Sequence, residues 1–184
     1  MLTFNFEPFP QLETERLCLK QITQADVHEV FCLRSDPRVM GFIDRPLATK
    51  LEDAAGLIKV IEDLLAANDG ITWGICFKKE MKLIGTIGFW RNDKQNHRGE
   101  IGYALHTDFH RKGIMQEAFV PVFKYGFEIM KLHSVEANVN PKNIASINLL
   151  KKFGFVQEAY FKENYYSNGQ FLDSAIFSLL SNVK

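Results

Sequence analysis

The sequence predicts a mixed α/β fold with about seven strands and four helices, in a single domain spanning residues 1–184. Short segments in which polar and apolar residues alternate are typical of half-buried strands. Between them lie longer segments whose apolar residues recur every three or four positions, as in helices that cover a sheet. Hydrophobic residues make up 46% of the chain and include 16 Phe, enough for a substantial core. Because strand and helix patterns are interspersed along the chain, they indicate one mixed sheet with helices packed on it.

The first expected elements are a strand, a short helix and a long loop. Residues 15–20, ERLCLK, alternate polar and apolar residues and predict the first strand. Thr23 followed by Asp26 resembles a helix N-cap with an acidic first turn. Residues 35–48 are rich in Pro, Gly and Asp, so we expect a loop there with little regular structure.

A second helix and a β-hairpin follow. Thr49 and Glu52 form a capping-box pattern, and the helical spacing of apolar residues continues toward Asn-Asp-Gly at 68–70, where the helix should stop. Residues 71–77, ITWGICF, and residues 82–90, KLIGTIGFW, are separated by the turn KKEM. This pattern predicts two antiparallel strands.

The C-terminal half alternates between the two kinds of element. We expect a strand over 100–106, a helix over 113–130, a strand over 134–139, a helix over 143–155, and two hairpin strands over 158–166 and 171–180. Pro121 lies well inside the first of these helices and predicts a kink or a lost backbone hydrogen bond near Glu117. Gly154 is a typical helix C-terminus, and Ser-Asn-Gly at 167–169 is a hairpin turn.

Charge balance, cysteine spacing and the pattern of apolar residues argue against several classes of protein. Lys plus Arg and Asp plus Glu both total 22, and this balance argues against a nucleic-acid-binding protein. The cysteines Cys18, Cys32 and Cys76 have no metal-ligand spacing and suit a reducing compartment. No secretory signal pattern opens the chain and no apolar run is long enough for a membrane span, so we expect a cytoplasmic protein.

A basic glycine turn separates a predicted strand from a predicted helix. Residues 99–105, GEIGYAL, precede it, and Arg111, Lys112 and Gly113 form the turn itself. Unpaired N–H groups at a helix N-terminus suit a phosphate or pyrophosphate, and Gly113 permits close approach to the backbone. An ordinary helix start with two solvated cations explains the same residues, and the turn alone does not separate these interpretations.

Four segments together resemble the GNAT superfamily of acetyl-CoA-dependent N-acetyltransferases, and within it the ribosomal-protein alanine/serine N-acetyltransferase group. Residues 110–115, HRKGIM, lie at the family's pyrophosphate loop, with His110 in place of Gln or Arg and Met115 in place of a small residue. Residues 143–155, NIASINLLKKFGF, are similar to the family's late helix. The segments over 35–58 and 168–180 are similar to its substrate-side loop and helix and to its closing hairpin.

The resemblance implies splayed central strands, with acetyl-CoA bound between the strands reading GEIGYAL and SVEANV. The residues it assigns to acetyl-CoA are Tyr103, Ala104, Leu105, Arg111, Lys112, Gly113, Ile114, Met115, Gln116, Asn138 and Asn143. Asn143 has an equally simple interpretation as a polar residue at a helix N-terminus. We expect acetyl-CoA as the co-substrate and no metal.

The resemblance also implies the chemistry. Glu100 stands where family members often carry the carboxylate that takes a proton from the amine through a water, although a solvated edge charge is its simple alternative. A backbone N–H near Leu105 would stabilise the oxyanion. Many relatives protonate the departing thiolate with a Tyr, but this chain has Leu150 there, which leaves Ser146, a water, Tyr103 or Tyr165. We expect direct transfer in a ternary complex, without a cysteine nucleophile.

Several alternatives stay open from the sequence. His106, Asp108 and His110 alternate and would share one face of a strand, as a metal site requires, but no further His or Cys cluster accompanies them. A CoA-binding module without turnover would also explain the departures from the family pattern.

The acceptor and the oligomeric state are not determined by the sequence. The acceptor is either a protein N-terminus, which needs an open groove, or a small amine such as a polyamine or aminoglycoside. A small polycation would need carboxylates, for which the candidates are Asp36, Asp44, Glu158, Glu163 and Asp173. Both a monomer and a homodimer remain open.

Overall fold

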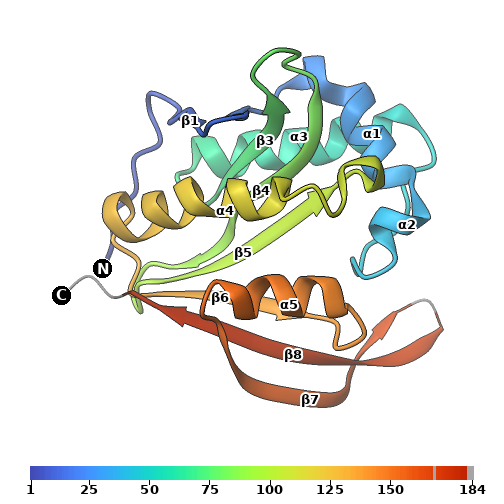
Figure 1. The fold of residues 1–184 in the computed structure, drawn as a ribbon, viewed down its shortest axis with the longest axis vertical. Coiled ribbons are helices and arrows are strands. Elements are labelled where there is room, and N and C mark those ends of the chain that lie inside the picture. The colour runs from blue at the N-terminus through green and yellow to red at the C-terminus, as the bar shows by residue number, and fades with distance from the viewer. Residues whose placement is uncertain (168, 182–184) are drawn as a thin grey trace.

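The computed structural model describes residues 1–167 and 169–181, which form one eight-stranded sheet in the order β1-β2-β3-β4-β5-β6-β8-β7 (Figure 1). The strands are β1 (Leu12–Glu13), β2 (Leu17–Gln21), β3 (Ile71–Phe77), β4 (Leu83–Asp93), β5 (Arg98–Leu105), β6 (Ser134–Val139), β7 (Val156–Ser167) and β8 (Gln170–Leu180). All neighbours are antiparallel except β5 and β6, which are parallel. The mixed α/β fold is confirmed, with one short strand more than expected.

Helices cover both faces of this sheet. They are α1 (Val27–Ser35), α2 (Pro37–Met40), α3 (Leu51–Ala66), α4 (Ile114–Lys124) and α5 (Ile144–Lys152). In Figure 1, α4 and α5 lie in front of the sheet and α3 lies behind it. The larger hydrophobic cluster joins α4 and Leu150 of α5 to the sheet, and a smaller cluster joins α1 and α3 to it.

The segment 35–48 is more ordered than its composition predicts. It contains the one-turn helix α2, which begins at Pro37, and the side chain of Asp36 caps that helix by accepting from the Arg38 N–H at 2.8 Å. Ala48 N–H donates to the Arg34 carbonyl at 2.9 Å and ties the end of the segment to α1. The expectation of a loop with little regular structure was therefore wrong at its start, because a capping Asp precedes the Pro.

The start of α3 also differs from the expected capping box. The carboxylate that accepts from Thr49 N–H and Lys50 N–H belongs to Asp53, at 2.8 and 3.2 Å, and the prediction of Glu52 in this role was wrong. The reason is a shift of one residue, since Lys50 is the N-cap and Asp53 is the third residue of the helix. The helix ends at Ala66, close to the predicted Asn-Asp-Gly stop.

The long C-terminal helices follow the predicted pattern with one change. Pro121 lies inside α4, which continues to Lys124 and then passes into a π-helical turn over Tyr125–Ile129. Gly154 follows α5 with a left-handed φ of +85°, as expected for a helix end. Strands β7 and β8 form the predicted antiparallel hairpin, while the middle residue of its turn, Asn168, lies outside the described residues.

Strands β5 and β6 separate after a short region of pairing. They pair at three positions, Arg98 with Ser134, Gly99 with Val135 and Glu100 with Glu136. Beyond these positions β5 runs on to Leu105 and β6 to Val139 without further pairing between them, and the opening between the two strands is visible in Figure 1. The predicted splay of the central strands is present, with Glu100 at its vertex.

Candidate active site

The splay leaves one main-chain edge on each strand facing the opening. The other edge of β5 is fully paired with β4, and the other edge of β6 is paired with β8. Beyond the vertex, the facing edges over 101–105 and 137–139 have no strand partner within the described part of the chain. Such edges offer N–H and C=O groups to an extended ligand, as a sheet edge offers them to an added strand.

A side-chain bridge crosses the opening between β5 and α5. The Tyr103 hydroxyl and the Ser146 Oγ lie 2.6 Å apart, and the Tyr103 ring packs edge-on against Phe119 of α4 with 4.9 Å between centroids. Burial raises the pKa of the Tyr103 phenol to about 12, against the opposing effect of its hydrogen bond with Ser146. The phenol is therefore protonated at neutral pH and can donate a hydrogen bond or a proton.

The turn before α4 has the backbone conformation expected of an anion-binding loop. Gly113 has φ of +73° and is the N-cap of α4, which begins at Ile114. The N–H groups of the first helical turn lack intrahelical partners and carry the positive end of the helix dipole. A Cβ at Gly113 would meet only the Arg16 guanidinium at 3.7 Å, so glycine is required here by the left-handed φ and not by crowding.

The two departures from the family pattern in this turn have structural explanations. The Met115 side chain is only 8% exposed and belongs to the main core, so it contributes its backbone and not its side chain to the turn. The His110 Nε2 lies 2.9 Å from the Leu105 carbonyl and joins the turn to the end of β5. The Lys112 carbonyl accepts from Arg16 at 3.2 Å, and Arg16 in turn pairs with Glu117 of α4.

Glu100 lies at the vertex of the splay in a partly buried position. Its side chain is 15% exposed, and the Arg91 guanidinium lies 3.7 Å from the carboxylate. Burial raises the pKa of the Glu100 carboxyl, and the positive charges of Arg91 and Arg98 oppose that shift. A partly desolvated carboxylate with a raised pKa is a stronger proton acceptor than an ordinary surface Glu.

The remaining predicted site residues divide between structural and exposed positions. Asn143 is the N-cap of α5, and its side-chain oxygen accepts from Ser146 N–H at 3.1 Å, which agrees with the simple helix-cap interpretation. Asn138 is exposed on β6. The Gln116 side chain accepts from Lys152 at 2.8 Å. Leu150 is completely buried in the main core, so its own side chain does not face the opening.

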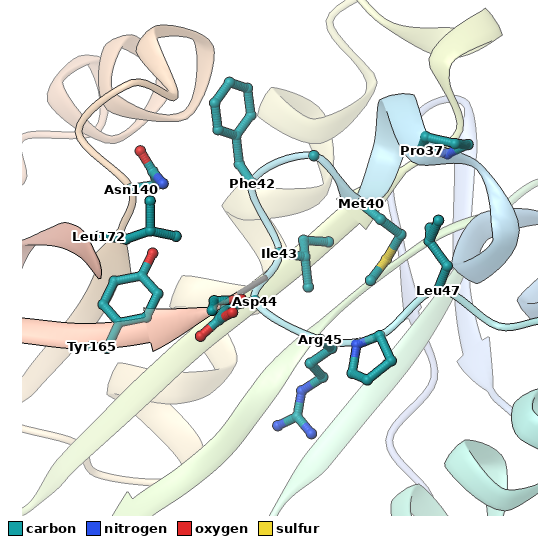
Figure 2. A pocket seen from close by; sticks show the side chains of 13 residues that line it. Pro37, Met40, Phe42, Ile43, Asp44, Arg45, Leu47, Asn140, Tyr165 and Leu172 are labelled. Carbon is teal, nitrogen blue, oxygen red and sulfur yellow. The ribbon is translucent and has the colours of Figure 1, made fainter. Parts of the chain in front are cut away.

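A cavity of about 500 Å³ lies between the segment after α2 and the β7–β8 hairpin, as Figure 2 shows. Segment 40–47 contributes one wall, and Asn140, Tyr165, Ser167 and Leu172 contribute the other. Burial raises the pKa of Tyr165; the Asn140 amide opposes that shift, and the charge of Asp44 adds to it. The first wall belongs to the segment that resembles the family's substrate-side loop, and Leu172 of the second belongs to the segment that resembles its closing hairpin.

Most carboxylates considered for a polycationic acceptor are already engaged. Asp36 is bonded to Arg38, which lowers the pKa of Asp36 to about 2. Asp173 accepts from the Tyr160 hydroxyl and, at 2.7 Å, from Glu163 N–H, and Glu158 accepts from Ser178 at 2.7 Å. Asp44 is the one member of this set that lines the cavity.

Two side chains near this cavity, Trp90 of β4 and Arg45 of the segment after α2, were missed by sequence reasoning. The Arg45 guanidinium carbon lies 5.4 Å from the centroid of the Trp90 ring. The two residues are 45 positions apart in the sequence, so no local pattern indicates their proximity.

Neither a metal cluster nor a membrane helix is found among residues 1–167 and 169–181. These residues contain no group of three or more His, Cys, Asp or Glu that could hold a metal ion. The His106 ring pairs with Asp108 at 3.6 Å, whereas His110 is directed to the Leu105 carbonyl. No described helix has the length and apolar character needed to cross a membrane.

Comparisons with known proteins agree with this geometry. The family model for the acetyltransferase (GNAT) domain matches residues 16–156. An uncharacterized N-acetyltransferase of Bacillus subtilis, YoaA, is 35% identical over 172 residues, covering 94% of this chain and 97% of the relative. The ribosomal protein uS5-alanine N-acetyltransferase of Escherichia coli is 29% identical over 108 residues, covering 58% of this chain and 56% of that protein.

Solved structures share the fold. A GNAT-family acetyltransferase from Bacillus anthracis superposes with a TM-score of 0.81 at 27% identity, covering 93% of this chain and 98% of that one. RimL, a ribosomal L7/L12 α-N-protein acetyltransferase solved in complex with coenzyme A, has a TM-score of 0.87 at 17% identity, covering 95% and 100% of the two chains.

Proposed function

This chain belongs to the GNAT acetyltransferase family and is an acyl-CoA-dependent acetyltransferase, and we propose that it transfers an acetyl group from acetyl-CoA to the N-terminal amine of a protein. The observation that carries the proposal is the opening between β5 and β6 with Glu100 at its vertex. Transfer is direct, in a ternary complex: burial raises the pKa values of the Cys18 and Cys76 thiols, and the exposed Cys32 does not line the cavity.

Acetyl-CoA would be held mainly by main-chain groups. The backbone of Tyr103, Ala104 and Leu105 faces the opening and suits the extended pantetheine. The N–H groups from Arg111 to Gln116, at the turn and the first helical turn of α4, suit the pyrophosphate. Asn138 would line the same opening from β6, while Asn143 would act mainly by capping α5.

Glu100 would act as the general base. An N-terminal amine with a pKa near 8 is mostly protonated at neutral pH and cannot attack a thioester in that form. A carboxylate acting through a water takes one proton from the ammonium, and the freed amine nitrogen bonds to the acetyl carbon. The C–S bond then breaks to release the thiolate, and the second proton that the nitrogen loses neutralises that thiolate by way of the proton donor. The raised pKa of the Glu100 carboxyl, caused by burial, suits this role.

The thiolate needs a proton donor from elsewhere in the site, because Leu150 stands where many relatives carry a donor Tyr. The Tyr103–Ser146 pair lies on the opening and carries a neutral phenol hydrogen-bonded to a hydroxyl. Ser146 would donate to the developing thiolate and be supported by Tyr103 behind it. The late helix would therefore supply its donor from Ser146, one residue of its first turn, while Leu150 is buried in the core and has no proton to give.

A protein N-terminus suits the acceptor site better than a small polycation. Three of the five carboxylates that would attract a polyamine or aminoglycoside, Asp36, Glu158 and Asp173, are engaged by neighbouring residues, and of the other two only Asp44 lines the cavity. The cavity lies between two separate segments of the chain, as an extended peptide requires. Two of the similar proteins, the uS5-alanine N-acetyltransferase and RimL, are named as acetyltransferases of ribosomal proteins.

The test begins with calorimetric titration of the purified protein with acetyl-CoA, with free CoA and ATP as comparisons. We expect micromolar binding of acetyl-CoA and none of ATP. Mass spectrometry then follows acetylation of a set of peptides with free N-termini, with spermidine and kanamycin as small-amine comparisons. Acetyl-CoA binding without acetylation of any amine would favour a CoA-binding module, and no binding at all would refute the placement of acetyl-CoA in the opening.

A further inference from the structure

An irregularity in β4 places Trp90 beside the active site. Between Phe89 and Arg91 the pairing of β4 with β5 shifts by one residue, so Trp90 is the extra residue of a β-bulge. The glycine at Gly102 of β5 makes room for its ring, because a Cβ there would lie 3.3 Å from the Trp90 side chain. The indole therefore lies against β5 two residues from Glu100.

Two guanidinium groups lie over this indole. The Arg91 guanidinium carbon is 4.2 Å from the ring centroid and that of Arg45 is 5.4 Å from it. Arg91 comes from β4 itself, and Arg45 comes from the segment that walls the cavity. Such cation–π contacts hold a guanidinium in place while leaving its N–H donors free for another partner.

A third cation stands close behind Arg45. Burial lowers the pKa of the Arg34 guanidinium, and the positive charge of Arg45 lowers it further. Within the described residues, neither Arg34 nor Arg45 forms an ion pair with a carboxylate. Asp44 does not compensate Arg45, because Figure 2 shows its side chain directed toward Tyr165 while the Arg45 side chain extends away from both.

Two neighbouring like charges without an acidic partner are unfavourable in the free protein. An anion that binds between the cavity and Trp90 would relieve this repulsion and gain charge-assisted hydrogen bonds from a planar guanidinium. The same charges disfavour a polycationic acceptor. The anion cannot be acetyl-CoA's pyrophosphate if that group lies at the turn before α4, because Arg45 and Trp90 belong to the acceptor cavity and its border.

We propose that Arg45, supported by Trp90 and Arg34, forms a carboxylate subsite for the acceptor, so that the preferred substrate is a peptide with an acidic residue close to its N-terminal amine. This inference rests on the proposed N-terminal acetyltransferase activity and narrows it. The amine of such a peptide lies at Glu100, and its acidic side chain reaches the Arg45 guanidinium across the Trp90 ring. Arg91 contacts both groups: its guanidinium lies 3.7 Å from the Glu100 carboxylate and packs on the Trp90 ring.

The test compares peptides that differ at one position. Tetrapeptides with N-terminal Ser, an amidated C-terminus and Ala elsewhere carry Asp, Asn or Lys at the second, third or fourth position in turn. We expect one Asp position to raise kcat/KM about tenfold to a hundredfold over the matched Asn peptide, which is the range of a charge-assisted hydrogen bond. The Lys peptide should be poorer than the Asn peptide, and added salt should narrow both differences.

Variants then assign the preference to this subsite. Arg45→Gln should reduce the Asp-to-Asn ratio to about one. Lys59→Gln is the matched control, because it removes the same charge from an exposed i,i+4 pair on α3 and should leave the ratio unchanged. Binding of the acidic peptide should also quench the tryptophan fluorescence. The quenched signal should come from Trp90, because the other tryptophan, Trp73, is completely buried.

The outcomes separate the inference from the function on which it rests. Acetylation of all peptides with equal kcat/KM at every Asp position would overturn the carboxylate subsite and leave the N-terminal acetyltransferase standing. A ratio that persists in Arg45→Gln would also overturn the subsite. Acetylation of spermidine in preference to every peptide, or of no amine at all, would overturn both.

Discussion

The two sides of the active site are built on different principles. On the proposed cofactor side, main-chain N–H and C=O groups of β5 and β6 face the opening, and the first turn of α4 offers further N–H groups. On the acceptor side, the cavity wall is a set of side chains from two segments, including Asp44, Arg45 and Tyr165. The difference explains why the cofactor turn departs from its family pattern at His110 and Met115 and yet keeps the backbone geometry of an anion-binding loop.

A main-chain site tolerates side-chain change as long as the backbone conformation is kept. Met115 is directed into the core, and the left-handed φ is carried by Gly113. A side-chain site has no such tolerance, because each substitution alters charge or shape directly. We therefore expect changes on the cofactor side to matter only when they move the backbone, and changes on the acceptor side to alter which amine is used.

The largest effect is expected at the vertex, where the two sides meet. Glu100→Gln should lower kcat by about a hundredfold or more at neutral pH, because the base is removed while shape is kept. In the wild type, kcat/KM should fall as pH drops through the raised pKa of Glu100, at a higher pH than for an ordinary Glu, because only the ionised form accepts a proton. The variant should lose this acidic limb, and a pH–rate profile measures both. An unchanged rate would mean that another group takes the proton.

The next effect tests the main-chain character of the cofactor side. Gly113→Trp should weaken acetyl-CoA binding about tenfold or more, because a side chain resists the left-handed φ and shifts the N–H groups of the turn. The fold should persist, since the nearest atom to a Cβ there is 3.7 Å away. Gly154→Ala is the matched control, with a similar φ of +85° at the end of α5 and no expected effect on affinity. Calorimetric titration with acetyl-CoA measures the affinity of each variant. Unchanged affinity in Gly113→Trp would contradict the assignment of this turn to the pyrophosphate.

A smaller effect is expected from restoring the family's Tyr. Leu150→Tyr should lower the free energy of unfolding by about 1–3 kcal/mol, because the position is completely buried and a larger polar side chain overpacks it. It should not raise kcat, since the new hydroxyl lies in the core and not on the opening. Urea denaturation and steady-state kinetics measure the two quantities. A gain in kcat without loss of stability would show that position 150 reaches the thiolate after all.

The smallest effect is expected at the bridge across the opening. Ser146→Ala should lower kcat about fivefold, the effect of one lost hydrogen bond to the developing thiolate. Tyr103→Phe keeps the ring against Phe119 and removes only the hydroxyl, so it serves as the matched comparison. If Tyr103→Phe lowers kcat far more than Ser146→Ala, the phenol is the direct donor and Ser146 supports it.

The elements of the fold were largely predictable from the sequence. The hairpin of β3 and β4, the helices α3 and α5, and the stop at Gly154 all follow from alternation, helical spacing and turn residues within a few positions of one another. The errors are also local. The capping carboxylate of α3 is Asp53 and not the predicted Glu52. Asp36 and Pro37 begin a helix in a segment whose composition is typical of a loop.

The geometry of the candidate site was only half predictable. The strand, the glycine turn and the helix N-terminus were predicted, because they are contiguous in the sequence, while their role as a cofactor site stays a prediction. The proximity of Tyr103 to Ser146 and of Arg45 to Trp90 was not predictable, because these pairs are far apart along the chain. No spacing rule connects residues that only packing brings together.

The sequence by itself thus determined the order of strands and helices, the glycine turn before α4 and the charge balance of the chain, because periodicity and backbone preferences act over a few residues. Only the tertiary structure decided that Met115 and Leu150 face the core, that Asp173 is already engaged, and that Arg45 lies over Trp90. These outcomes depend on the packing of elements against one another, and the position of Trp90 depends in addition on a β-bulge that shifts the register of β4 and β5 by a single residue.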